Sequence, residues 1–365
     1  MADSQPSAQV AISTASTRMK KLLDEAIAKK ASDLHVAVGV PPILRVDGKL
    51  AAVSGQDPLT PVETRKLAES LMTEAQLERL LEQRDIDFSF GYQTMRFRAN
   101  IFFERGSIGV SLRLIPKELQ SIGDLKLPSF LEKFTLPTQG LVLITGPTGH
   151  GKTTTVSALI KHINDTRREH IITIEDPIEY IFEHKKSVIQ QREVGSDATS
   201  FASALRAALR EDPNIVVLGE MRDLETIEAA LTVAETGHLV FATLHTNNAA
   251  QTADRIIDVF PPHQQTQIRS QLANVLLGIV SQRLLPRVAG GRIVAAEIMI
   301  ANAAVRNLIR EGKAHQLNNI IQTSAAEGMI GLDKILAELV TKGEVTIDDA
   351  LTWANDPKQF KSMVY

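Results

Sequence analysis

The chain of 365 residues contains no cysteine. Disulfide bonds, iron–sulfur clusters and cysteine-ligated zinc are therefore excluded, and nothing requires an oxidising compartment. No apolar run approaches the roughly 18–20 residues that span a membrane. The beginning of the chain, MADSQPSAQVAISTAS, lacks the basic start and apolar core of a signal peptide. We expect a disordered polar tail over residues 1–17 and a cytoplasmic protein with no direct membrane span.

The sequence also lacks an excess of positive charge. Lys and Arg number 40 against 43 Asp and Glu, which gives a net charge of −3, and aromatic residues make up only 4%. Nucleic-acid-binding domains usually carry a basic excess, and grooves for single strands add aromatic side chains. We therefore expect no nucleic-acid partner. The 44% of hydrophobic residues suffices for substantial cores, and the length suggests two domains.

The first part of the chain, residues 18–116, predicts a small α+β domain. TRMKKLLDEAIAKK has apolar residues at helical spacing. Two capping boxes, Thr60-x-x-Glu63 and Thr73-x-x-Gln76, predict helices over about 61–71 and 74–83. Alternating segments predict strands in DLHVAVG, PPILRVDGKL with a turn at Asp47-Gly48, DFSF, MRFRANIFF and SIGVSLRLI.

After a proline-containing linker over 117–137, the pattern changes to alternating strands and helices. The apolar segments LVLITG, HIITIED, NIVVLGE and HLVFATLH are each followed by a helical pattern. Continuous apolar strands that alternate with helices predict an α/β fold with a parallel sheet covered on both faces. This domain occupies 138–365. Helices dominate from 246 onward, interrupted by the strand RIVAAEIMI, and the end of the chain, about 301–365, is helical.

One stretch between the first apolar strand and its helix matches the phosphate-binding pattern G-x-x-x-x-G-K-[ST]. Glycines allow backbone N–H groups to converge on phosphate oxygens, the lysine reaches the β- and γ-phosphates, and the following hydroxyl ligates Mg²⁺. The sequence therefore predicts a site for ATP and Mg²⁺ at Gly146, Pro147, Thr148, Gly149, His150, Gly151, Lys152, Thr153 and Thr154. His150 fills a variable position, where we expect its main-chain N–H to matter more than its imidazole.

Hydrolysis of a nucleotide also needs carboxylates near the phosphates. Ligands of open α/β sheets lie at the carboxyl ends of the strands, where the cluster Glu175–Glu179 and Glu220 are expected. Glu220 is placed like a metal-contacting acid, although the aspartate that usually precedes it is Gly219. A helix-capping role for Glu220 and a solvated turn for the cluster are the simpler alternatives.

Two histidines, His238 and His245, lie on either side of the fourth apolar segment. Seven residues of strand span roughly 23 Å, and an odd spacing points the side chains to opposite faces, so the pair cannot share one metal ion. His245 ends the strand beside the expected phosphates and is a candidate γ-phosphate sensor or water-orienting group. His238 begins the strand, where packing or hydrogen bonding is the simpler interpretation.

MRFRANIF places Arg96 and Arg98 on one strand face, and SLRLI adds Arg113. A solvated strand face explains them, and so does an arginine finger that reaches a neighbouring subunit's nucleotide. Near the other end, Asn302 predicts the start of a surface helix. The apolar side of that helix is formed by Ala304, Val305, Leu308 and Ile309, and the other side is shared by Arg306, Asn307, Arg310 and Glu311.

Taken together, these stretches resemble one family, the secretion ATPases of the type II/type IV pilus superfamily, and within it the pilus retraction ATPases. The resemblance spans roughly 30–340. Its matching stretches are ASDLHVAVGVPPILRVDGKL, GPTGHGKTTT, IITIEDPIEY, IVVLGEMRDLET, TGHLVFATLHT and AVRNLIRE.

The resemblance implies roles that composition and spacing do not. Glu179 would polarise the attacking water, and Glu220 would act at Mg²⁺. His238 and His245 would form a histidine pair of the family. The three arginines would reach the adjacent subunit's nucleotide, and the helix 304–311 would serve retraction rather than ATP binding.

The resemblance also implies an architecture and partners. We expect a PAS-like N-terminal domain, a RecA-like ATPase domain and a homohexameric ring at the cytoplasmic face of the inner membrane. ATP hydrolysis would drive pilus retraction, and hence twitching motility, through the inner-membrane platform protein. The four-cysteine zinc site of the extension ATPases is missing. An accessory retraction ATPase, a RecA-like nucleic-acid motor and a regulatory nucleotide-binding protein without turnover remain alternatives.

Overall fold

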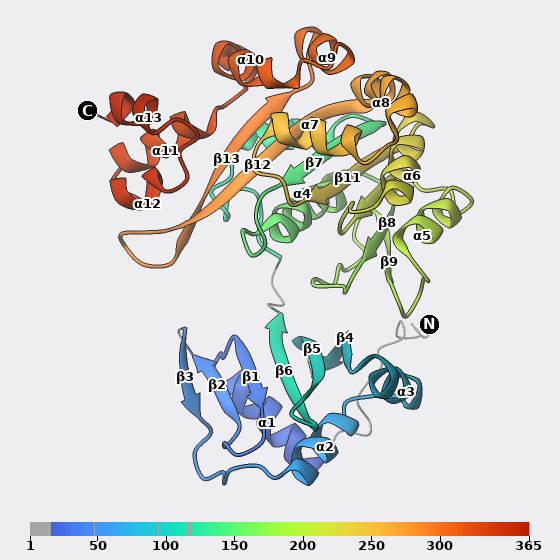
Figure 1. The fold of residues 1–365 in the computed structure, drawn as a ribbon, viewed down its shortest axis with the longest axis vertical. Helices are drawn as coiled ribbons and strands as arrows, with labels where there is room; N and C mark the ends of the chain where they lie inside the picture. Colours follow the sequence, from blue (N-terminus) through green and yellow to red (C-terminus); the bar gives the residue numbers. More distant parts are fainter. Residues whose placement is uncertain (1–15, 47, 94, 116–118, 365) are drawn as a thin grey trace. The chain divides into compact units, whose positions relative to one another are not determined.

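The computed structural model describes residues 16–46, 48–93, 95–115 and 119–364. The chain divides into two compact units, shown in Figure 1. The first comprises Met1–Glu118 together with Pro177–Ile181, and the second comprises Leu119–Asp176 and Phe182–Tyr365. Most of the tail expected over 1–17, and Asp47 of the expected turn, lie outside the described residues.

The first unit is built on a sheet of six strands in the order β3-β2-β1-β6-β5-β4, with every neighbouring pair antiparallel. Its core contains Leu22 and Leu23 of the first helix together with inward-facing residues of the strands. The elements are α1 (Thr17–Ala28), β1 (Asp33–Val36), β2 (Ile43–Val46), β3 (Lys49–Ala52), α2 (Pro61–Glu69), α3 (Glu74–Gln83), β4 (Asp85–Tyr92), β5 (Met95–Glu104) and β6 (Ser107–Ile115).

Both capping boxes are confirmed. The hydroxyl of Thr60 accepts from the backbone N–H of Glu63, whose carboxylate accepts from the Thr60 N–H, and Thr73 and Gln76 repeat this arrangement. The reciprocal bonds satisfy two backbone donors that the first turn of each helix leaves without an intrahelical partner.

The two faces of β5 also follow the predicted alternation. Phe97, Ala99 and Ile101 are buried in the core of the first unit, whereas Arg96 and Arg98 lie on the partly exposed face. The period of two along a strand accounts for this separation.

The second unit contains a sheet of seven strands in the order β13-β12-β7-β11-β10-β8-β9. All pairs are parallel except β12 with β13. The strands are β7 (Gly140–Thr145), β8 (His170–Glu175), β9 (Val188–Glu193), β10 (Ile215–Leu218), β11 (Leu239–Leu244), β12 (Leu276–Pro286) and β13 (Arg292–Ile300).

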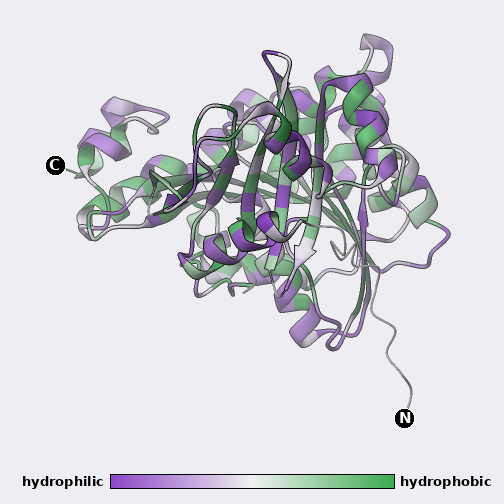
Figure 2. Cartoon of the chain, turned by 90° about the horizontal axis from the view of Figure 1, so that it is seen from below, coloured by the Kyte–Doolittle hydropathy of each residue, from purple (hydrophilic) through white to green (hydrophobic). Residues whose placement is uncertain are grey.

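Helices cover both faces of this sheet, as the continuous apolar strands predicted. Leu141 and Leu143 pack with α5 (Phe201–Ala208), α6 (Leu224–Glu235), α7 (Ala249–Asp258), α8 (Pro262–Val275) and α9 (Ala303–Arg310). The alternate residues Val142 and Ile144 pack with α4 (Lys152–Thr166) and the 3₁₀ turn η1 (Ser129–Thr135). Figure 2 shows the helices with hydrophobic and hydrophilic residues interspersed, in keeping with one buried and one exposed side.

The last helices, α11 (Leu332–Thr341), α12 (Ile347–Leu351) and α13 (Pro357–Val364), pack on the hairpin formed by β12 and β13. Two short helical segments, η2 (Ala314–Gln316) and η3 (Ala325–Glu327), flank α10 (Leu317–Thr323) before them. No helix in the described part of the chain is long and apolar enough to cross a membrane.

The expectation that helices fill the chain from 246 up to RIVAAEIMI was wrong at β12, and β9 was not predicted. β12 is almost wholly buried, between β7 and β13. A strand buried on both faces has no alternation, so its apolar run resembles that of a buried helix. Its pairing with β7 on one side and β13 on the other decides its conformation.

Candidate active site

Three adjacent parallel strands carry the predicted phosphate-binding loop and its partners to one edge of the sheet. β7 leads into the loop at Gly146, β11 leads to His245, and β10 leads to Gly219 and Glu220. The carboxyl ends of parallel strands meet at the same edge, which is where ligands bind in open α/β sheets.

The loop adopts conformations that require glycine. Gly146, Gly149 and Gly151 all have positive φ, at 145°, 80° and 79°. A Cβ on Gly146 would also lie 2.5 Å from the carbonyl oxygen of Gln282. Gly151 is the N-cap of α4, so the loop ends at a helix N-terminus, whose unpaired N–H groups and dipole favour an anion.

Lys152 is buried, with 7% of its surface exposed. Its Nζ donates to the carbonyl oxygens of Gly146 at 2.9 Å and Pro147 at 3.1 Å, and lies 3.2 Å from Nδ1 of His245. These contacts hold the ammonium group within the curve of the loop, where a phosphate would compete for its donors.

His245 joins the loop to Glu220. Its Nδ1 is also 3.1 Å from the hydroxyl of Thr148, and its Nε2 is 3.0 Å from Oε1 of Glu220. A lysine ammonium can only donate, so Nδ1 acts as an acceptor and the Nε2 proton points to the carboxylate. The imidazole thus connects Lys152 with an acidic residue two strands away.

Glu220 is further bound by Arg222, whose Nε donates to the same Oε1. The hydrogen bond and the negative charge of Glu220 raise the pKa of Arg222. Gly219, where an aspartate is usual, leaves little room for a side chain. A Cβ there would lie 3.3 Å from Cα of Glu175 and 3.4 Å from the carbonyl oxygen of Ile174. The close approach of β8 and β10 explains the glycine.

The two ends of the predicted acidic cluster lie in different units. Glu175 ends β8, is 8% exposed, and accepts from the Thr173 hydroxyl at 2.6 Å and the Gln191 amide at 3.2 Å. Glu179 belongs to Pro177–Ile181 of the first unit, where its carboxylate lies 3.8 Å from Nη1 of Arg98. Glu175 therefore has the buried, hydrogen-bonded environment of a structural residue.

The other two arginines have partners of their own. Arg113 lies opposite Asp33 on the neighbouring strand, and its Nε donates to that carboxylate at 3.0 Å. Burial would raise the pKa of Asp33, but hydrogen bonds from Ser32 and Arg113 lower it overall. Arg96 donates to the carbonyl oxygen of Ile178 at 3.0 Å.

His238 lies at the opposite end of β11 from His245. Its Nδ1 is 3.0 Å from the carbonyl oxygen of Val233 and 3.3 Å from the hydroxyl of Thr236. The structure does not bring His238 to the edge that carries the loop, because the whole length of β11 separates the two histidines. This is the hydrogen-bonding environment that the sequence suggested as the simpler interpretation.

Comparison with known proteins identifies the family. The profile of the family described as "Type II/IV secretion system protein" matches residues 10–351. The chain belongs to this family. Among its relatives, the "Type IV pilus retractation ATPase PilT" of Pseudomonas aeruginosa is 45% identical over 90% of this chain and 96% of its own length. The "Type IV pilus ATPase PilU" of the same organism is 39% identical over 94% of this chain and 91% of its own length.

A solved structure agrees with this assignment. It is described as the pilus retraction motor PilT with bound ADP, and it superimposes on this member of the type II/IV secretion family with a TM-score of 0.87. The two chains are 49% identical, and the match covers 94% of this chain and 98% of the other. The family and the fold class predicted from the sequence, a RecA-like ATPase domain preceded by a small α+β domain, are therefore confirmed.

The donors of this family member suit Mg²⁺ that is shared with a nucleotide. Within the described ranges, no group of three or more His, Cys, Asp or Glu could hold a metal ion by itself. Mg²⁺ usually takes one or two carboxylates and completes its shell with water and phosphate oxygens. The carboxylate of Glu220 at the strand end and the hydroxyl of Thr153 in the first turn of α4 fit that chemistry.

The structure gives the side chain of His150 contacts that the sequence did not predict. Nδ1 accepts from the backbone N–H of Leu284 at 3.0 Å, and the ring packs edge-on against Trp353, with 5.0 Å between ring centroids. Burial, with the positive charges of Arg283, Lys152 and Arg292, lowers the pKa of His150. The imidazole is therefore neutral at neutral pH.

Sequence reasoning also missed Arg222 and Gln282 as neighbours of the site. Arg222 follows Glu220 by two residues, so its proximity to the acid was a signal available in the sequence. Gln282 is 1% exposed and donates from Nε2 to the carbonyl oxygen of His150 at 2.6 Å. No local pattern indicates that contact, because 132 residues separate the two.

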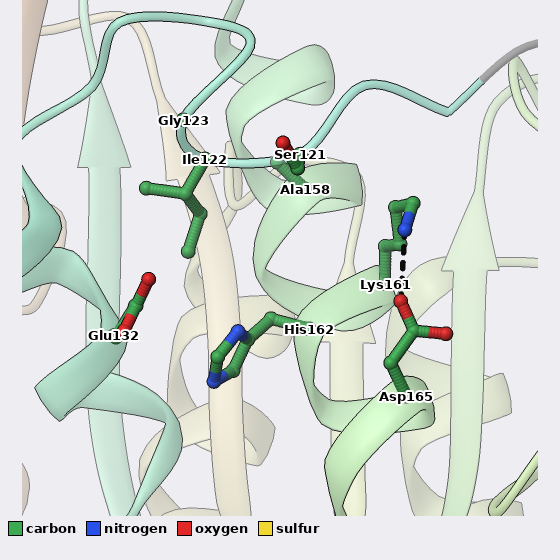
Figure 3. Close-up of a pocket in the computed structure, with 8 residues that line it drawn as sticks. All are labelled: Ser121, Ile122, Gly123, Glu132, Ala158, Lys161, His162 and Asp165. Carbon is green, nitrogen blue, oxygen red and sulfur yellow. Dashed lines mark hydrogen bonds and ion pairs between the residues drawn. The ribbon is translucent and has the colours of Figure 1, made fainter.

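A cavity of about 150 Å³ lies between α4, the 3₁₀ turn η1 and residues 121–123. Figure 3 shows the residues that line it, among them Lys161, His162 and Asp165 of α4 and the segment Ser121–Gly123. Lys161 donates to Asp165 at 2.8 Å. None of its lining residues belongs to the phosphate-binding loop, and it contributes nothing to the site described above.

Proposed function

We propose that this chain is a ring-forming motor that hydrolyses ATP to power the retraction of type IV pili. The observation that carries the proposal is the line of contacts Lys152–His245–Glu220 at the carboxyl edge of the sheet. In this proposal, these contacts join a lysine that binds phosphate, a polar sensor and an acid that binds Mg²⁺. Identity of 45% to a pilus retraction ATPase supports the same conclusion.

In this proposal, backbone N–H groups of residues 146–151 and the N-terminus of α4 bind the phosphates of ATP. Lys152 turns its donors from the loop carbonyls to the β- and γ-phosphates. Thr153 and Glu220 hold Mg²⁺, which neutralises the charge that develops on the phosphates.

Hydrolysis proceeds by attack of a water oxygen on the γ-phosphorus. The new P–O bond forms as the bond between the γ-phosphorus and the bridging oxygen to the β-phosphate breaks. Glu179 polarises the water and accepts its proton, and the products are ADP and phosphate. His245 contacts both Lys152 and Glu220, so it senses whether the γ-phosphate is present.

The assembly is a homohexamer that works at the cytoplasmic face of the inner membrane on the platform protein of the pilus. Arg96, Arg98 and Arg113 supply positive charge to a neighbouring subunit's nucleotide. The chain is more similar to PilT, at 45%, than to PilU, at 39%, which favours the principal retraction ATPase over an accessory one.

A deletion strain tests the proposal when it is complemented either with the wild-type chain or with Lys152→Ala. We expect the deletion to produce long pili that do not retract, and only the wild-type chain to restore twitching. ATPase assays with and without DNA add an independent test. Normal retraction in the deletion strain, or strong stimulation of ATP hydrolysis by DNA, would overturn the proposal.

A further inference from the structure

The phosphate-binding loop lies directly against β12. Gly146 approaches the carbonyl oxygen of Gln282 so closely that a Cβ would lie 2.5 Å from it. The amide of Gln282 donates back to the carbonyl oxygen of His150, and the ring of His150 accepts from the N–H of Leu284. The loop thus lies against β12 at Gly146 and is hydrogen-bonded to residues 282–284 at His150.

The bond from Leu284 takes the place of a strand pairing. β7 runs beside β12 only as far as Thr145, which pairs with Ser281. Beyond that point, no strand in the described part of the chain pairs with the edge of β12 that faces away from β13. The N–H of Leu284 points to this side and donates to Nδ1 of His150 at 3.0 Å. The imidazole therefore accepts a bond that a backbone carbonyl accepts elsewhere in the sheet.

The ring of His150 also packs against the helical end of the chain. Trp353, two residues beyond the end of α12, packs against His150 at an interplanar angle of 74°. The guanidinium of Arg283 lies 5.3 Å from the centroid of Trp353 and donates to the carbonyl oxygen of Asn247, two residues beyond His245. Trp353 thus contacts both the loop and the residue that holds the segment after β11.

We propose that His150 is a positioning residue: its Nδ1 and its contact with Trp353 hold the phosphate-binding loop in its nucleotide-binding shape. Resting on the proposed function of the loop, this assigns to the side chain a role that the loop pattern does not require. It also makes the shape of the loop depend on the C-terminal helices. Loss of the acceptor leaves the N–H of Leu284 without its partner and releases the loop from β12.

Two substitutions separate the position of the acceptor from the size of the side chain. In His150→Asn, Oδ1 is as many bonds from Cα as Nδ1 is in histidine, so the amide can accept from Leu284. In His150→Gln, the acceptor lies one bond further out and cannot take the same place. Both variants are uncharged and polar, and thermal unfolding checks that each one folds.

The measurement is ADP affinity together with the fluorescence of Trp353. This is the sole tryptophan of the sequence, so its emission reports on the junction alone. In the full-length wild-type chain, we expect added ADP to shift the emission. We expect His150→Gln to weaken ADP binding about tenfold, equal to about 1.4 kcal/mol, and to reduce the emission change. His150→Asn should recover most of the ADP affinity, because its Oδ1 takes the place of Nδ1, but not the emission change, because the amide lacks the ring that packs against Trp353.

The outcomes distinguish the two claims. Equal ADP affinity in wild type, His150→Asn and His150→Gln would overturn the role of the imidazole, and an equal loss of affinity in both variants would overturn the role of Nδ1 as the acceptor from Leu284. A wild-type emission that ADP leaves unchanged would overturn the link to Trp353. Failure of the wild-type chain to bind ADP at all would instead remove the proposed function, and the positioning role with it.

Discussion

Glu220 accepts from both His245 and Arg222 through one carboxylate oxygen, Oε1. The side chain of Glu220 is 17% exposed, whereas that of Arg222 is 76% exposed. The acid is therefore held between a partner inside the site and a partner at its surface. An exchange of the exposed arginine for Mg²⁺ would leave the bond from His245 in place.

We predict that Glu220→Gln reduces ATP hydrolysis about a hundredfold, the scale of a lost transition-state contact. The amide keeps the size of the side chain and a hydrogen-bond acceptor but loses the negative charge that Mg²⁺ requires. ADP affinity should fall less than kcat, which steady-state kinetics and equilibrium binding measure. Glu228→Gln, an exposed change on α6, is the matched control. Equal kcat values for the two variants would contradict the role of Glu220.

The sequence predicted the loop residues well and the contacts of His150 poorly. Gly146 and Lys152 belong to a local pattern in which the backbone binds the phosphates, so their types follow from their spacing. The partners of His150 are Leu284 and Trp353, more than a hundred residues away in the sequence. Only the fold determines which side chains meet there.

At the scale of elements, Glu297 of β13 joins two helices. Its carboxylate accepts from the N–H groups of Ala249 and Leu332, the first residues of α7 and α11. Complete burial raises its pKa from 4.5 to about 7, although both hydrogen bonds and Arg283 act in the opposite direction. A neutral carboxyl group is thus favoured between the two helix N-termini at acidic pH.

This arrangement predicts how stability changes with pH. The folded chain keeps the proton of Glu297 between pH 4.5 and about 7, whereas the unfolded chain loses it. The contribution of this group to the free energy of unfolding is complete below pH 4.5. It decreases as the pH rises through about 7, by at most about 1.4 kcal/mol per unit.

Glu297→Gln removes the titrating group and isolates this effect. We predict that the Tm of the variant rises relative to that of the wild type as the pH increases from 4.5 to 8. Thermal unfolding at several pH values measures the difference. Glu338→Gln on α11, whose side chain is 44% exposed, should show a nearly constant difference. A constant difference for Glu297→Gln as well would exclude the proton held between α7 and α11.

The surface helix predicted from Asn302 onward is α9, but two of its residues differ from expectation. Ala304, expected on the apolar side, is exposed. Arg306, expected on the polar side, turns toward α8 and donates from Nη1 to the carbonyl oxygens of Ala273 and Asn274. These carbonyls belong to the last turn of α8, which lacks intrahelical partners, so Arg306 caps the neighbouring helix.

We predict that Arg306→Ala lowers the free energy of unfolding by about 2 kcal/mol, since it leaves two carbonyls of α8 without a charged donor. Arg306→Lys should restore part of this loss. Arg310→Ala, which removes bonds to the exposed side chains of Asn307 and Asn274, should cost less than about 0.5 kcal/mol. Denaturant unfolding compares the three. A similar cost for Arg306→Ala and Arg310→Ala would argue against the cap.

Elements with a local signal were predictable, and those defined by their neighbours were not. The capping boxes at Thr60 and Thr73 fix where α2 and α3 begin. β12 carries an apolar run that suits a buried helix equally well, and only pairing with β7 and β13 makes it a strand. β9 pairs with β8 alone at the edge of the sheet, and its predominantly polar residues gave no strand signal.

At the scale of the whole molecule, the proposed ring requires each active site to be completed by a neighbour. The side chain of Arg113 is 68% exposed although it binds Asp33, so part of its guanidinium group is accessible to a neighbouring subunit. In a heterologous ring interface, one surface of each subunit contacts a different surface of the next. We propose that an arginine of the first unit serves the nucleotide of another subunit, which subunit mixing tests directly.

We predict that Lys152→Ala and Arg113→Ala subunits, each inactive alone, recover ATPase activity when mixed. At some interfaces an intact loop from the arginine variant then meets an intact arginine from the loop variant, and that site is complete. ATPase activity measured across mixing ratios should exceed the sum of the separate activities. Asp33→Asn removes the partner of Arg113 but keeps the arginine. It therefore separates the effect of losing this ion pair from the effect of losing the arginine that reaches the neighbouring nucleotide. If Arg96, Arg98 and Arg113 variants all fail to recover activity, the arginines do not act between subunits.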